Sequence, residues 1–162
     1  IVLSRGIQSA SSEQIDHDEN AVSIHVRRGD YLEPKYWKTT GCVCQLPYYL
    51  NAIAEMNKRI SQPSYYVFSD DIAWVKENLP LPKAFFIDWN KGTESWQDMM
   101  LMSRCRHHII CNSTFSWWGA WLNPRENKTV IMPERWFRHC ETPDICPDKW
   151  IKVPINQPDS IQ

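Results

Sequence analysis

Residues 23–31 read Ser23-Ile24-His25-Val26-Arg27-Arg28-Gly29-Asp30-Tyr31, so an apolar run typical of a β-strand leads into two arginines and an aspartate. Two adjacent guanidinium groups indicate an anion clamp, because each presents a rigid fork of donors that matches phosphate oxygens. We expect Arg28 to pair inward with Asp30. The alternative is a surface charge cluster, in which the arginines do no more than pair with that aspartate.

Outside this segment, short apolar runs alternate with stretches of helical period, which is the pattern of a parallel sheet built from right-handed βαβ units. The sequence therefore predicts an α/β fold, a Rossmann-like parallel sheet layered with helices. The expected strands cover 21–26, 65–68, 84–87, 108–111 and 129–132, and the expected helices cover 46–60, 70 or 71 to 79, 94–105 and 114–122. The remainder after residue 133 is rich in Pro, Trp and Cys, and we expect it to pack across the domain.

Polar side chains follow four of the predicted strands. The arginine pair follows the first strand, residues 69–71 the second, 88–90 the third and 112–114 the fourth. Ligands of open parallel sheets bind beyond the carboxyl ends of the strands, so these segments should meet at one binding edge. The chain has five glycines and no glycine-rich phosphate loop. Phosphate would then be held by Arg27, Arg28 and the N-terminus of the helix near Ser113, unless that serine is an ordinary helix cap.

Two clusters could be mistaken for metal sites. Asp70 and Asp71 are adjacent on an extended chain, so their carboxylates point to opposite faces and rarely reach one ion. His107 and His108 are separated in the same way, which argues against a tetrahedral site with the neighbouring cysteines. The tryptophans at 117, 118 and 121 fall at helical spacing, which favours core packing over a sugar platform. We therefore expect no metal.

Three segments resemble the signature of the α-1,2-fucosyltransferases, glycosyltransferase family 11, in the order of that family. They are 25–31, Phe68-Ser69-Asp70-Asp71, and Asn112-Ser113-Thr114-Phe115-Ser116-Trp117-Trp118-Gly119-Ala120-Trp121-Leu122, and the last looks bacterial. The resemblance implies the C-terminal, nucleotide-sugar-binding half of a GT-B enzyme. It also implies inverting, metal-independent transfer of L-fucose from GDP-β-L-fucose to the 2-hydroxyl of a terminal β-galactoside, with no cofactor besides this donor substrate.

The resemblance also implies roles for individual residues. An acid after the second strand would accept hydrogen bonds from guanine, with Asp71 preferred over Asp70 and the other aspartate capping the helix. The predicted catalytic residues are Arg27, Arg28 and Asp30, and the predicted donor-binding residues are His25, Arg27, Arg28, Asp70, Asp71, Ser113, Thr114, Phe115, Ser116 and Trp117. The predicted organisation is a polar connector over 1–20, a GDP-fucose-binding domain over 21–154 and a tail over 155–162.

Composition limits the partners. With 18 Lys+Arg against 19 Asp+Glu, the formal charge is −1, so no basic field attracts nucleic acid. Of six cysteines, Cys140 and Cys146 are the favoured pair if any disulfide forms. The resemblance favours a bacterial cytoplasm, with membrane association of the full-length protein left open.

The chain begins at Ile1 rather than Met, so we expect a missing upstream portion, and the resemblance implies that this portion is an N-terminal acceptor domain. The chain should then bind GDP without transferring fucose, and associate with itself or with the missing portion. Two other functions stay open. One is a non-catalytic nucleotide- or glycan-binding module. The other is a protein O-fucosyltransferase-like domain, which residues 112–118 argue against.

Overall fold

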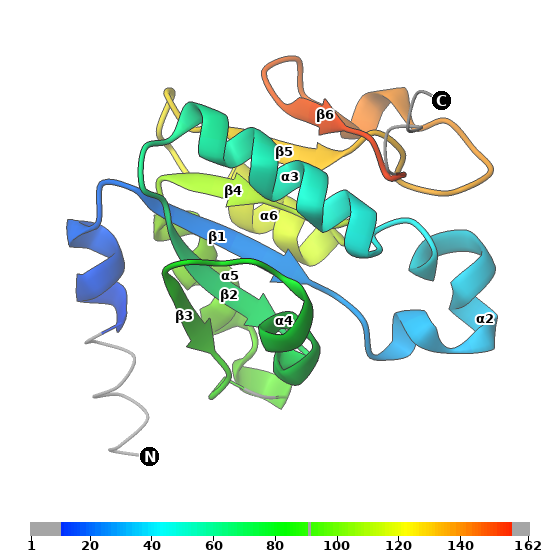
Figure 1. The fold of residues 1–162 in the computed structure, drawn as a ribbon, viewed down its shortest axis with the longest axis horizontal. Coiled ribbons are helices and arrows are strands. Elements are labelled where there is room, and N and C mark those ends of the chain that lie inside the picture. The colour runs from blue at the N-terminus through cyan, green and yellow to red at the C-terminus, as the bar shows by residue number, and fades with distance from the viewer. Residues whose placement is uncertain (1–10, 91, 157–162) are drawn as a thin grey trace.

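The computed structural model describes residues 11–90 and 92–156, so parts of the predicted connector (1–10) and tail (157–162) lie outside the described residues. Its centre is a six-stranded sheet in the order β3-β2-β1-β4-β5-β6, with every neighbouring pair parallel (Figure 1). The predicted α/β class with a Rossmann-like parallel sheet is confirmed. The strands are β1 (Ala21–Val26), β2 (Ser64–Ser69), β3 (Ala84–Ile87), β4 (His107–Ile109), β5 (Val130–Pro133) and β6 (Ile151–Val153).

Helices cover both faces of the sheet (Figure 1). One core cluster joins α3 (Leu46–Arg59) and α4 (Ile72–Asn78) to one face of the sheet, and a second joins α5 (Trp96–Arg104) to the other, where α6 (Thr114–Trp121) packs against α5. The chain is also helical over 11–17. Short helical turns form at η1 (Asp30–Leu32), α2 (Pro34–Tyr36), η2 (Trp37–Gly41), η3 (Gly92–Glu94) and η4 (Pro143–Ile145).

Strand β1 lies at the centre of this architecture. All six of its residues are buried, and it pairs with β2 on one side and β4 on the other. Its alternate side chains serve the two layers: Val22, Ile24 and Val26 join the cluster of α3 and α4, and the hydroxyl of Ser23 lies 2.8 Å from Nδ1 of His108. The chain therefore leaves β1 at a rigid point, between strands whose connections run in opposite directions along the sheet.

The C-terminal part differs from the prediction in one element. Five strands were expected, but Ile151–Val153 adds a sixth, paired with β5. Trp136 and Trp150 are buried in a cluster that also contacts Trp117, so this part does pack against the domain. The expected core role of the α6 tryptophans is wrong for Trp118 and Trp121, which are 47% and 50% exposed because they lie on the outer face of that helix.

The start of α5 and the state of the cysteines can be compared with the sequence predictions. The helix expected to begin at residue 94 begins at Trp96, after the turn η3. All six cysteines are free thiols, including Cys140 and Cys146. Among the described residues, no helix is both long enough and apolar enough to cross a membrane.

Candidate functional site

A cleft of about 820 Å³ lies at the carboxyl edge of the sheet, over the ends of β3, β2, β1 and β4. This is the edge at which the sequence placed the polar segments. It includes the gap between β1 and β4, where the direction of the chain connections reverses and where open α/β sheets bind their ligands. Residues that line the cleft include His25, Arg27, Asp30 and Tyr31 after or in β1, Phe68, Ser69 and Asp70 from β2, Asp88, Asn90, Ser95 and Asp98 beyond β3, and Ser113 and Phe115 beyond β4.

Among the described residues that line the cleft, Arg27 is the cation. Its Nε donates to Asp30 Oδ1 at 2.9 Å and lies 3.4 Å from Asp70 Oδ2. Burial opposes its charge, but the two carboxylates outweigh burial and raise the pKa of Arg27. Within the described residues neither Nη group makes a hydrogen bond, so the end of the guanidinium fork is available to a ligand. The expected pairing of Arg28 with Asp30 is wrong, because successive side chains of an extended chain point to opposite sides and Arg27 takes the side of Asp30.

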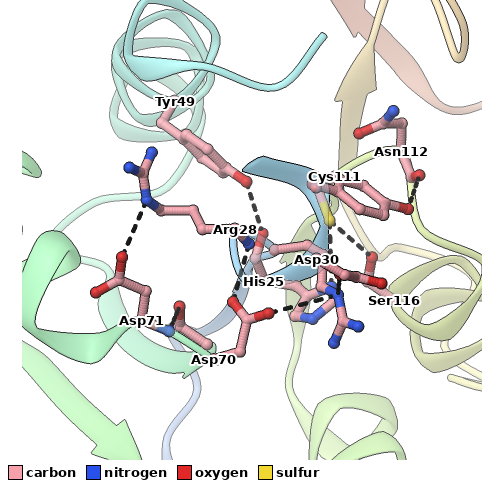
Figure 2. A network of polar contacts seen from close by, with 12 residues as sticks. His25, Arg28, Asp30, Tyr49, Asp70, Asp71, Cys111, Asn112 and Ser116 are labelled. Carbon is pink, nitrogen blue, oxygen red and sulfur yellow. Dashed lines mark hydrogen bonds and ion pairs between the residues drawn. The ribbon is translucent and has the colours of Figure 1, made fainter. Parts of the chain in front are cut away.

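Arg28 belongs to the framework beside the cleft. Its Nε donates to Asp71 Oδ2 at 3.2 Å (Figure 2). Its guanidinium carbon lies 4.1 Å from the centre of the Trp74 ring, which is a cation–π contact. The side chain is 14% exposed and does not line the cleft. Its backbone N–H donates to Asp70 Oδ1 at 2.9 Å, which ties the end of β1 to the end of β2.

Asp70 and Asp71 have different environments, as their adjacency predicts. Asp70 lines the cleft, where it accepts from the Arg28 backbone and faces Arg27. Asp71 lies outside the cleft lining and caps α4 by accepting from the Trp74 N–H at 3.1 Å. The sequence pattern left the cap open between Asp70 and Asp71, and the resemblance favoured Asp70; the structure places the cap at Asp71. Gly29 permits the arrangement, since a Cβ there would lie only 2.7 Å from Asp70 Oδ2.

The N-terminus of α6 reaches the cleft through two of its predicted residues. Ser113 and Phe115 line it. Thr114 is exposed outside the lining, and the buried Ser116 uses its hydroxyl to donate to the Ser113 carbonyl at 3.3 Å. The indole N–H of Trp117 donates to the Ile145 carbonyl at 2.8 Å, so that side chain is anchored to the C-terminal part instead of the cleft.

His25 forms part of the cleft wall and is 7% exposed. Its Nδ1 lies 3.2 Å from Cys111 Sγ, and its ring contacts Phe115 with centroids 5.7 Å apart. Burial, together with the nearby charge of Arg27, lowers the pKa of His25 to about 3. The imidazole is therefore neutral at physiological pH. The sequence singled out His25 but not Cys111, because a cysteine in an apolar run reads as a small core residue.

Asp98 is a cleft residue that the sequence did not reveal. It lies in the first turns of α5, where an acid three residues after Ser95 reads as an ordinary N-terminal helix residue. Its Oδ1 instead accepts from Asn90 Nδ2 at 2.6 Å, across the end of the cleft. Burial raises the pKa of Asp98 to about 6. In the part of the chain that is described, no three His, Cys, Asp or Glu side chains gather as a metal site.

Comparison with known proteins gives consistent results. Residues 5–153 match the family described as Glycosyl transferase family 11. The chain is 38% identical over 138 residues to an alpha-1,2-colitosyltransferase of Escherichia coli, covering 83% of this chain and 48% of that protein. It is 36% identical over 140 residues to the O-antigen biosynthesis glycosyltransferase WbnK of the same organism, covering 86% and 46%.

A galactoside alpha-(1,2)-fucosyltransferase 1 of Ateles belzebuth is 34% identical over 111 residues, covering 66% of this chain and 30% of that protein. The chain thus spans about half the length of the bacterial relatives, and less of the primate one. The family match covers nearly all of the described residues, including the whole cleft. This chain belongs to glycosyl transferase family 11.

Proposed function

We propose that this chain is the donor-binding part of an inverting, metal-independent α-1,2-fucosyltransferase. It takes GDP-β-L-fucose and transfers fucose to the 2-hydroxyl of a terminal β-galactoside. The observation that carries the proposal is the cleft at the β1–β4 switch point, with the open end of the Arg27 guanidinium and the N-terminus of α6 on its walls. A guanidinium fork and free helix N–H groups are both suited to a diphosphate. The names of the α-1,2-specific relatives support the linkage.

The reaction assigns a clear task to Arg27. The acceptor hydroxyl oxygen attacks C1 of the sugar while the bond from C1 to the β-phosphate oxygen breaks. The electron pair of that bond leaves with GDP, and the hydroxyl proton passes to a carboxylate or to water. A cation placed before the reaction stabilises this developing charge more than it stabilises the bound donor. Asp30 and Asp70 hold Nε, which orients the remaining donors of Arg27 toward the phosphates. Among the carboxylates that line the cleft, Asp30 lies nearest to the Arg27 guanidinium, with Oδ1 2.9 Å from Nε.

Asp98 is the carboxylate that we propose for guanine recognition. Guanine presents N1–H and N2–H₂ side by side, which suits one carboxylate. Asp70 accepts from the Arg28 backbone at Oδ1 and lies beside Arg27 with Oδ2, and Asp71 lies outside the lining. Oδ2 of Asp98, in contrast, makes no hydrogen bond or ion pair within the described residues. Bound guanine would also favour the charged form of Asp98 and offset its burial.

Asp98→Asn should therefore lower the preference for GDP over ADP and UDP by about 10- to 100-fold, as expected for loss of a charge-assisted hydrogen bond. The asparagine side chain has an NH₂ group in place of one carboxylate oxygen, so it cannot accept a hydrogen bond from guanine at both positions. Asp70→Asn and Asp71→Asn are the comparisons, measured by calorimetry with all three nucleotides. Loss of selectivity in Asp71→Asn but not in Asp98→Asn would return the guanine contact to the residue that the sequence favoured.

Metal independence is tested separately. With the phosphates held by a guanidinium group and helix N–H donors, EDTA should leave both GDP affinity and fucosyl transfer by the full-length enzyme unchanged. Transfer that stops with EDTA and returns with Mg²⁺ or Mn²⁺ would show that the aspartates of the cleft hold an ion.

The donor itself is tested by a thermal-shift panel of GDP, GDP-fucose, GDP-mannose and UDP-sugars. Stabilisation by GDP and GDP-fucose, with little by UDP-sugars, is expected. Absence of stabilisation by any guanine nucleotide would refute the proposal. The colitosyltransferase relative adds GDP-colitose to the panel, since colitose lacks the 3-hydroxyl of fucose. Tighter binding of that donor than of GDP-fucose would make colitose the transferred sugar.

A further inference from the structure

The wall of the cleft contains a histidine, His25, whose ring nitrogen Nδ1 lies against the buried thiol of Cys111. His25 Nδ1 lies 3.2 Å from Cys111 Sγ, and both side chains are buried (Figure 2). Nε2, the other ring nitrogen, makes no hydrogen bond within the described residues. Because His25 lines the cleft, Nε2 is the ring nitrogen that remains for a ligand there. A neutral imidazole carries one N–H, and the partner of one nitrogen decides which nitrogen holds it.

The contacts of the sulfur indicate that the thiol is the donor. A thiol sulfur is a weak acceptor, whereas an unprotonated imidazole nitrogen is a good one, so the short contact favours donation from the thiol to the ring. The nearest acceptor is His25 Nδ1 at 3.2 Å, while Ser116 Oγ lies farther away at 3.8 Å. Burial raises the pKa of the Cys111 thiol to about 12, so its hydrogen stays in place at neutral pH.

We propose that Cys111 is a positioning residue that fixes His25 as the Nε2–H tautomer, so that the cleft presents a neutral N–H donor to an oxygen of the bound nucleoside diphosphate. This inference rests on the proposed function for the identity of the ligand. The donor completes the cleft wall between Arg27 and Phe115 without adding a second charge beside the guanidinium. Cys111 acts only through His25, because it does not line the cleft.

The direct test is the imidazole nitrogen NMR spectrum of the ¹⁵N-labelled chain without nucleotide. The signal of His25 is assigned among the five histidines with a His25→Gln variant. The wild type and Cys111→Ser, which keeps a donor, should show the Nε2–H pattern. Cys111→Ala should lose the dominance of that tautomer. A wild-type spectrum with the hydrogen on Nδ1 would overturn the proposal, as would an unchanged tautomer in Cys111→Ala.

Nucleotide binding provides the second measurement. GDP affinity should fall about 2- to 10-fold in Cys111→Ala, as expected for one neutral hydrogen bond, and should be restored in Cys111→Ser. Cys105→Ala is the matched control, since Cys105 is a buried thiol outside the cleft that contacts the Leu101 carbonyl. An equal loss in Cys105→Ala would mean a general packing effect and would overturn the proposal. If GDP fails to bind the wild type, the proposed function fails, while the spectrum still decides the role of the thiol.

Discussion

Replacing Arg27 with alanine should lower the rate of fucosyl transfer by the full-length enzyme by about 10²–10³-fold, and should weaken GDP binding by this chain. The rate effect is that expected when one donor to a developing charge is removed. Arg27 is the arginine that lines the cleft; its Nε is held by two carboxylates, and its other donors make no hydrogen bond within the described residues. Single-turnover kinetics and calorimetry measure the two effects.

Two variants show whether the effect belongs to the guanidinium of Arg27. Arg27→Lys keeps the charge but removes the planar fork, so it should recover only part of the loss. Arg28→Ala removes the contacts with Asp71 and Trp74 outside the cleft. It should therefore lower the melting temperature and leave GDP affinity close to the wild-type value. A GDP affinity that falls in Arg28→Ala but stays at the wild-type value in Arg27→Ala would reverse the roles of the two arginines.

Acidification from pH 7 to pH 5 should lower the free energy of unfolding by about 3 kcal/mol, because two buried histidines together lose about 4 kcal/mol and Asp98 returns about 1 kcal/mol. Burial lowers the pKa of His25 and of His108 to about 3, from an ordinary value of 6.5. A depressed histidine pKa means that the unfolded state binds the proton first, so stability is complete above pH 6.5 and is lost as the pH falls toward 3. Each histidine then loses about 2 kcal/mol by pH 5.

Asp98 opposes this trend in part. Its pKa is raised to about 6, so its penalty is largest at neutral pH and is relieved on acidification, which returns at most about 1 kcal/mol after screening by solvent. Urea denaturation at a series of pH values measures the slope. His108→Gln should make the decrease in the free energy of unfolding between pH 6 and pH 5 shallower, because one fewer group takes up a proton on unfolding. A wild-type stability that is flat over this range would contradict the prediction.

The sheet could be predicted because its strands are short apolar runs separated by stretches of helical period. Strand β1 and the polar segments at its carboxyl edge follow from that alternation alone. Strand β6 could not be predicted, because Ile151–Val153 has only three residues in a proline-rich setting and becomes a strand only by pairing with β5. The exposed face of α6 was equally hidden, because spacing shows that tryptophans share a face but not which face meets the core.

The site divides in the same way. Arg27 was predictable from its motif, and period-two alternation already implies that Arg27 and Arg28 cannot both face the cleft. Asp98 was not predictable, because the packing of α5 beyond β3, and no local pattern, brings its carboxyl to Asn90. The position of the Cys111 thiol hydrogen depends on two segments that meet only in the folded chain, one with His25 and one with Cys111 and Ser116.

The position of β1 gives the two ends of the cleft different local stabilities. His25 and Arg27 are anchored at a strand with neighbours on both sides, so that end opens only when the sheet itself unfolds. Asp88 and Asn90 follow β3, an edge strand that pairs with β2 alone, and that end can open at a lower free energy. A ligand that bridges both ends ties the edge strand to the centre of the sheet. Part of its binding free energy is thereby converted into protection of β3 and the start of α5 against local unfolding.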